Sequence, residues 1–321
     1  MHPIVLPTPF PVGPVNCWLL RGEPLTLVDT GPHTPEALAA LEAGLQERGL
    51  RVEDIELLIL THQHSDHLGL ASTIRERSGC VVAAHRLLAP YAADIEGAMA
   101  AEEAWEAHLL DLHGTPAPRR DAFLEVFRDR LPFAGSGVAV DLVLDDGDIV
   151  EAGGRRLRVD RRPGHSPTDT VFSDDEAGIA LVADHLIAHI SSNPLVHRPP
   201  EGPDDPLERP SSLLSYLESL AVTAAEEITV LRTGHGAEIT DPRPLIAERV
   251  RLHHARAEKV RVALAAGPRS ASELGVSLWP NLPVNQTFLI LCEVLGALDL
   301  LEAGGAVSSV LCDERLVYET G

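Results

Sequence analysis

Short apolar runs and helical patterns alternate along the first 85 residues of the chain. A fully apolar run covers residues 57–60, and a similar run covers 81–84. Residues 3–29 have the pattern of short strands separated by turns. Helices are expected over residues 34–48, which begin with Thr-Pro-Glu, and over about 68–77. Strands and helices in this order predict an α/β fold.

The pattern changes between residues 86 and 140, where helical periodicity replaces apolar runs. Helices are expected over residues 92–112 and 121–131. An insertion of this length often frames a pocket as a wall or lid. If it does so here, Trp105 or Phe127 contacts the substrate. If it does not, these side chains only pack.

Strands resume over residues 142–182, and a helix over 211–225 and a strand over 228–231 follow. A second change comes near residue 250, after which three helical stretches precede two strand-like pieces that end at Tyr318. We therefore predict a catalytic domain over residues 1–249, with the insertion at about 86–140, and a small C-terminal domain over 250–321.

The most informative chemistry lies directly after the apolar run 57–60, in the sequence Thr61-His-Gln-His-Ser-Asp-His67. Three imidazoles and one carboxylate within six residues are typical of a metal site. A loop that follows a buried strand can direct His62 and His64 toward one point and Asp66 and His67 toward a neighbouring point. Neutral imidazoles suit zinc or iron, and a carboxylate helps to hold a second divalent ion.

Three more candidate ligands follow in the same surroundings. His165 lies on a turn bounded by glycine and prolines, Asp184 ends an apolar run, and His235 lies in a Thr-Gly-His-Gly sequence after the expected strand 228–231. Loops at strand ends are where functional sites are usually built. We therefore expect all these side chains to meet at one site.

This ordered set of motifs resembles the metallo-beta-lactamase superfamily, in particular its glyoxalase II and lactamase-beta-like types. The resemblance covers about residues 1–250 and implies an αββα sandwich of two mixed sheets flanked by helices. It implies two metal ions, with zinc expected and iron or manganese as alternatives. It also implies that Asp29, in Val-Asp-Thr-Gly, orients the ligands. By this resemblance the first-metal ligands are His62, His64 and His165, the second-metal ligands are Asp66, His67 and His235, and the bridging ligand is Asp184.

Metal ions of this kind activate water and polarise a carbonyl group, which suits hydrolysis of a thioester, lactone or carboxylic ester. Asp66 is expected to accept a proton during catalysis. The loop that follows Asp184 is expected to contact the substrate through His189, Ser191 and Asn193. Other isolated histidines are interpreted as surface residues or supports of the ligands: His33, His85, His108, His113, His197, His253 and His254.

Two alternatives stay open. The order of elements in the tail resembles a winged helix, as found in a lactamase-beta-like endoribonuclease, so metal-dependent cleavage of RNA is one alternative. A mononuclear iron sulfur dioxygenase is the other. Against nucleic acid, the chain has a formal net charge of −22, whereas affinity for phosphates rests on Lys and Arg.

Composition suggests a cytoplasmic protein. The four cysteines are widely spaced and form no metal-binding or disulfide pattern. We expect neither a signal peptide nor a membrane span, because no basic N-terminal region precedes an apolar one and no run of eighteen uncharged apolar residues occurs. The expected partner is a small acyl substrate, and a homodimer is a candidate assembly.

Overall fold

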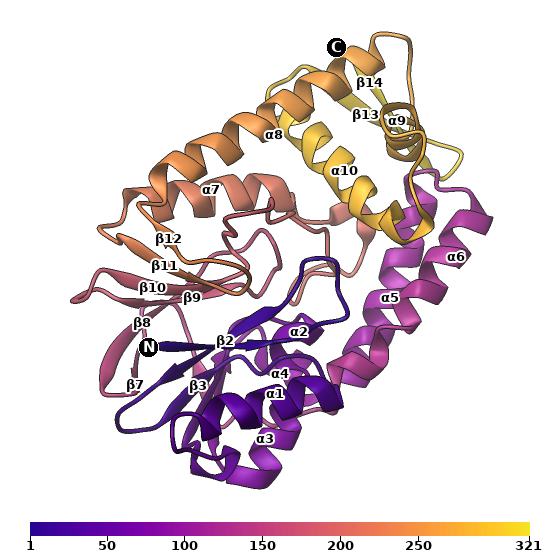
Figure 1. Cartoon of the computed structure of the whole chain (residues 1–321). Helices are drawn as coiled ribbons and strands as arrows, with labels where there is room; N and C mark the ends of the chain where they lie inside the picture. The colour runs from indigo at the N-terminus through magenta and orange to yellow at the C-terminus, as the bar shows by residue number, and fades with distance from the viewer.

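Two six-stranded mixed sheets lie at the centre of the computed structural model, which describes residues 1–321 (Figure 1). The first sheet contains, in spatial order, β1 (His2–Leu6), β2 (Val15–Leu20), β3 (Thr26–Val28), β4 (Leu57–Leu60), β5 (Val81–His85) and β6 (Leu142–Leu144). Its first three strands are antiparallel, and β3 to β6 are parallel.

The second sheet is antiparallel except for one pair. It contains, in spatial order, β12 (Ile239–Thr240), β11 (Val230–Thr233), β10 (Ile179–Ala183), β9 (Thr170–Asp174), β8 (Arg155–Arg161) and β7 (Ile149–Ala152). The parallel pair is β10 and β11, so the loops that follow these two strands leave the sheet at the same edge.

Strand β4 shows why the predicted apolar run is buried on both faces. Successive side chains of a strand point to opposite faces. Leu57 and Ile59 belong to the buried cluster between the two sheets, together with residues of the second sheet such as Phe172. Leu58 and Leu60 belong to a cluster on the outer face of the first sheet. The uninterrupted run is thus the pattern of a strand that is covered twice.

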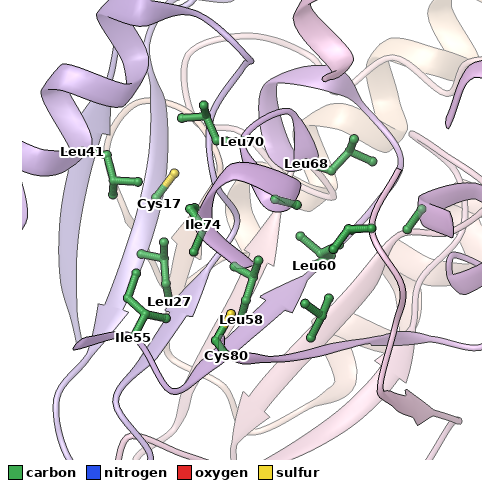
Figure 2. Close-up of a cluster of buried hydrophobic side chains, with 14 of the residues drawn as sticks. Cys17, Leu27, Leu41, Ile55, Leu58, Leu60, Leu68, Leu70, Ile74 and Cys80 are labelled. Atoms are coloured by element: carbon green, nitrogen blue, oxygen red, sulfur yellow. The ribbon is translucent and has the colours of Figure 1, made fainter. Parts of the chain in front are cut away.

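Helices cover the outer face of each sheet. Figure 2 shows Leu41 and Ile74 in one cluster with Leu27 and Leu58 of the first sheet; the first two come from α1 (Pro35–Gln46) and α3 (Ala71–Ser78), which pack on that sheet. Helix α7 (Ser212–Ala225) covers the second sheet through its buried leucine and tyrosine side chains, which pack with strands β9 and β10. The predicted layers of helices and mixed sheets are confirmed.

The insertion consists of α4 (Ala89–Ala93), α5 (Ile95–Leu112) and α6 (Ala117–Arg128). The tail contains α8 (Arg243–Leu264), α9 (Ala271–Leu278), α10 (Thr287–Ala303), β13 (Val307–Cys312) and β14 (Arg315–Thr320). Figure 1 shows α5 and α6 beside α9 and α10. Side chains of both regions form one cluster, the insertion–tail core, whose members include Trp105, Leu109, Phe123, Val260, Phe288, Leu295 and Tyr318.

The insertion–tail core bears on two predictions. Trp105 is buried in it, so this side chain packs inside the protein. The predicted domain boundary at 249/250 lies inside α8, whose Ile246 packs with the second sheet and whose Val260 packs in the insertion–tail core. The tail has the predicted order of helices followed by a hairpin, and its likeness to a winged helix stays a prediction.

One helical segment, Val284–Ala303, is long and apolar enough to cross a membrane by length and composition. However, 56% of the most apolar 18-residue stretch of this segment is buried inside the structure, as in the core helix of a globular protein. Smaller differences from the predicted pattern occur at element ends. The helix expected over 68–77 is two helices, α2 (Ser65–Leu68) and α3, and four short 3-10 helices occur at Val52–Asp54, Leu131–Ala134, Pro206–Glu208 and Val284–Gln286.

Candidate metal centre

All seven predicted ligands lie together at the ends of strands. His62 and His64 follow β4, and Asp66 and His67 lie on α2, one helical turn that begins where the loop was expected to continue. The other three ligands come from the turn after β8, the end of β10 and the end of β11, namely His165, Asp184 and His235.

Three imidazole nitrogens converge in the first ligand group, which consists of His62, His64 and His165. His64 Nδ1 lies 3.1 Å from His62 Nε2 and 2.9 Å from His165 Nε2. Burial lowers the pKa of His62 and His64, and neighbouring imidazoles lower it further. Both effects favour the neutral form of these two rings.

The outer nitrogens of two rings show which atoms face inward. His165 Nδ1 donates to the backbone carbonyl of Asn193 at 3.2 Å, so its Nε2 carries the free lone pair. His62 Nδ1 lies 3.0 Å from Thr61 Oγ1, whose hydroxyl donates to Asp29. His62 therefore also presents a lone pair on Nε2, and lone pairs that point at one another suit a shared cation.

The second ligand group consists of Asp66, His67, Asp184 and His235. His67 Nδ1 donates to Asp29 at 2.8 Å, and His235 Nδ1 donates to the Pro14 carbonyl at 2.8 Å. The inward atoms are buried and have no hydrogen-bond partner in the protein; they are His67 Nε2, His235 Nε2 and Asp184 Oδ1.

The spacing of these atoms fits coordination of an ion. His67 Nε2 lies 3.4 Å from Asp184 Oδ1, and His235 Nε2 lies 3.4 Å from Asp66 Oδ2 and 3.5 Å from Asp184 Oδ2. Ligand atoms about 2.1 Å from a tetrahedral zinc ion lie about 3.4 Å apart. Buried polar atoms normally find partners, so this set of unpaired atoms is one that could hold a metal ion.

The charges at the centre also favour a cation. Burial lowers the pKa of His67, but the carboxylates of Asp184 and Asp29 outweigh burial, and the net pKa is raised well above its ordinary value. The same carboxylates that favour a proton on this ring favour a metal ion beside it. Burial raises the pKa of Asp184, but His67 and His235 outweigh it, so its carboxyl group is ionised.

Two further residues shape the second ligand group. Asp29 has a left-handed backbone conformation, with φ at +61°, and accepts hydrogen bonds from the Thr61 backbone N–H and from His67. The role of orienting ligands stays a prediction for Asp29. Gly234 precedes His235, and a Cβ atom at this position would overlap Asp184 Oδ1 and lie 2.7 Å from His67 Cε1. Only glycine fits so close to the ligands.

Two of the three predicted substrate residues lie beside candidate ligands or their neighbours, namely His189 beside Gly236 and Asn193 beside His165. His189 is exposed, and its Nε2 lies 3.4 Å from the Val12 carbonyl. Asn193 contacts His165 through its backbone carbonyl, and the side chain of Ser191 makes no hydrogen bond. A substrate-binding role for these residues stays a prediction.

A cavity of about 230 Å³ adjoins the first ligand group. It is lined by Gly164 and Ser166, the neighbours of His165, and by His197, which contacts His64. The insertion contributes Arg86 and Leu87 to the lining, and no lining residue comes from the helices over 92–131. Among the isolated histidines, His197 is therefore the one that lies at the centre, whereas His85, His113 and His253 are buried elsewhere.

Comparisons with known proteins agree with this geometry. Residues 10–235 match the family model of the metallo-beta-lactamase superfamily. The chain is 32% identical to the probable metallo-hydrolase YqjP of Bacillus subtilis, over 99% of this chain and 97% of that protein. It is 30% identical to the hydroxyacylglutathione hydrolase of Cereibacter sphaeroides over 154 residues, which is 48% of this chain and 41% of that enzyme.

Solved structures extend the likeness to the tail. A metallo-beta-lactamase family protein of Thermus thermophilus is 31% identical, with a TM-score of 0.80 over 100% of this chain and 98% of that chain. A beta-lactamase domain protein of Burkholderia ambifaria is 27% identical, with a TM-score of 0.81 over 99% and 92% of the two chains. Together with the seven converging candidate ligands, these matches show that the chain belongs to the metallo-beta-lactamase superfamily and is a metallo-hydrolase of that family.

Proposed function

We propose that this chain is a binuclear metal-dependent hydrolase that cleaves a thioester, lactone or carboxylic ester. The proposal rests mainly on the position of Asp184 between the two ligand groups. Its Oδ2 lies 3.6 Å from His165 Nε2 in the first group and 3.5 Å from His235 Nε2 in the second. A carboxylate between two groups of ligands suits a pair of ions, which we propose to be zinc, with iron or manganese as alternatives.

The chemistry divides between the ions and the protein. When bound, such ions lower the pKa of water toward neutrality and polarise a substrate carbonyl. Asp29 keeps the proton of His67 on Nδ1, so that Nε2 faces inward. Asp66 is buried beside His235. We assign to its carboxylate the acceptance of a proton from the tetrahedral intermediate that forms when water adds to the substrate carbonyl.

Acyl substrates are favoured over RNA for two reasons. The first is the similarity to a hydroxyacylglutathione hydrolase, which extends over 48% of the chain. The second is that two basic residues of the tail pair with carboxylates: Arg256 lies 2.9 Å from Glu293, and Arg261 lies 2.7 Å from Glu258. Cations that are already paired offer little to a phosphate backbone. The complete second ligand group argues against a mononuclear iron sulfur dioxygenase.

The test begins with metal analysis of the purified, metal-replete chain, for which we expect about two ions per chain. Hydrolysis of thioesters, lactones, carboxylic esters and single-stranded RNA is then compared. His62→Ala and Asp184→Ala should abolish acyl hydrolysis, whereas His254→Ala, at an exposed position of α8, should not. Absence of bound transition metal would refute the proposal. Metal-dependent RNA cleavage that is lost in His62→Ala would replace it with the endoribonuclease alternative.

A further inference from the structure

His197 lies between a metal ligand and the insertion. Its Nε2 is 3.3 Å from His64 Nε2, and its Nδ1 is 2.9 Å from Glu102 Oε1. His64 follows β4, His197 lies in the loop after Asp184, and Glu102 lies on α5. A chain of contacts therefore connects the insertion with the first ligand group.

Glu102 is held firmly in this chain. Its side chain is nine-tenths buried, and its Oε1 accepts a second hydrogen bond from the backbone N–H of Arg198 at 3.0 Å. One carboxylate oxygen thus fixes both the ring of His197 and the backbone of the next residue. Hydrogen bonds to an ionised group are about twice as strong as neutral ones.

The positions of the protons follow from the inward nitrogen of His64. Its Nδ1 faces the other ligands of the first group, so the proton of this neutral ring lies on Nε2. That proton is donated to His197 Nε2, and the proton on His197 Nδ1 is donated to Glu102. Each donor in the chain meets an acceptor.

We propose that Glu102 and His197 are positioning residues for the first metal ion, and that they act by holding the ring of His64 through this hydrogen-bond chain. The proposal rests on the metal centre of the proposed function. Partners of this kind orient a ligand and fix its tautomer, and their loss typically lowers metal affinity about 10- to 100-fold. Helix α5 then serves as a support of the metal centre.

A third metal site is the competing explanation of the same residues. Ligand atoms of Glu102, Glu106 and His197 lie within 4.8 Å of one another, and Glu106 Oε2 is buried without a partner. However, an ion on His197 Nδ1 would move the proton of this ring to Nε2. Two N–H groups would then face each other 3.3 Å apart, at His197 and His64. The hydrogen-bond chain avoids this conflict.

The first experiment measures stepwise Zn²⁺ and Co²⁺ affinity by competition with a chromophoric chelator. In Glu102→Ala and His197→Ala we expect the affinity of the first site to fall about 10- to 100-fold, with the second site unchanged. Glu102→Gln keeps an oxygen acceptor and should lose less than Glu102→Ala. The matched control is Glu103→Gln on the same helix, where the carboxylate pairs with Arg128 at the surface.

Visible spectra of the Co²⁺ protein show which metal site has lost affinity. His165→Ala, which alters the first site, and His235→Ala, which alters the second, provide the reference spectra. Unchanged affinities in both alanine variants would overturn the proposal. So would an equal loss at both sites, because it would indicate general destabilisation. Thermal unfolding of each variant separates these cases.

Nitrogen-15 NMR spectra of the metal-loaded chain show independently which ring nitrogen of each histidine carries a proton. We expect His197 to carry its proton on Nδ1 and His64 on Nε2. More than two ions per chain, with the extra ion lost in Glu106→Gln, would overturn the proposal in favour of a third metal site. A chain that binds two ions but cleaves no acyl substrate would refute the proposed reaction alone, since these measurements do not depend on activity.

Discussion

We predict that the insertion and the tail unfold as one cooperative unit, and mutation of the contact between Phe123 and Phe288 tests this. Phe123 lies on α6 and Phe288 on α10, and both side chains are buried in the insertion–tail core. Their ring centroids are 5.4 Å apart, and the rings are stacked with an interplanar angle of 16°. We replace each residue by alanine, singly and together.

The expected size follows from burial and stacking. Removal of a buried Phe side chain costs about 3–5 kcal/mol of unfolding free energy. Stacked aromatic pairs are coupled by about 0.5–1.5 kcal/mol beyond burial. The double variant should therefore lose less than the sum of the single variants by about that amount.

Urea unfolding followed by circular dichroism measures these free energies in a double-mutant cycle. The control cycle pairs Phe123 with Leu41, which is buried in the separate cluster behind the first sheet. Distant positions add to within about 0.3–0.5 kcal/mol. A Phe123–Phe288 coupling no larger than that of the control pair would refute the view that the two regions share one core.

Three further predictions follow from single side chains. Gly234→Ala should abolish binding at the second ligand group, measured as loss of one metal ion per chain, because its Cβ would overlap Asp184. Trp105→Ala should lower unfolding free energy by about 3–5 kcal/mol and leave KM for an acyl substrate unchanged, because Trp105 packs in the insertion–tail core. Burial, and next the carboxylate of Glu102, raises the pKa of Glu106 well above its ordinary value of 4.5. Between these two values the unfolded chain has released a proton that the folded chain retains, so wild-type stability falls as the pH rises. Glu106→Gln should therefore stabilise the metal-free protein at pH 8 and have little effect on its urea midpoint at pH 4.

The layers of the fold could be predicted because the apolar residues within each strand or helix show which of its faces are buried. Strand β4 is apolar at every position and is covered on both faces. The same reasoning could not identify the partner of α5, because a helical pattern shows that a face is buried but not what covers it. One of the two interpretations that the sequence leaves open is that the insertion frames a pocket through Trp105 or Phe127. Instead, Trp105 packs against the tail, and the insertion meets the cavity only through Arg86 and Leu87.

The ligands of the metal centre could be predicted from the sequence for a related reason. The residues that hold His64 in place, His197 and Glu102, could not. The ligands lie on loops or on a helical turn within a few residues of a strand end, so neighbouring residues show where their side chains lie, and few structural roles explain so many histidines. His197 lies 133 residues from His64 and 95 residues from Glu102, in a loop rich in proline. Nothing in its own surroundings distinguishes it from the other isolated histidines. Its place depends on how α5 packs against the rest of the chain, and that packing is set by the insertion–tail core. A change in this core that shifts α5 should therefore reach the first ligand group through Glu102.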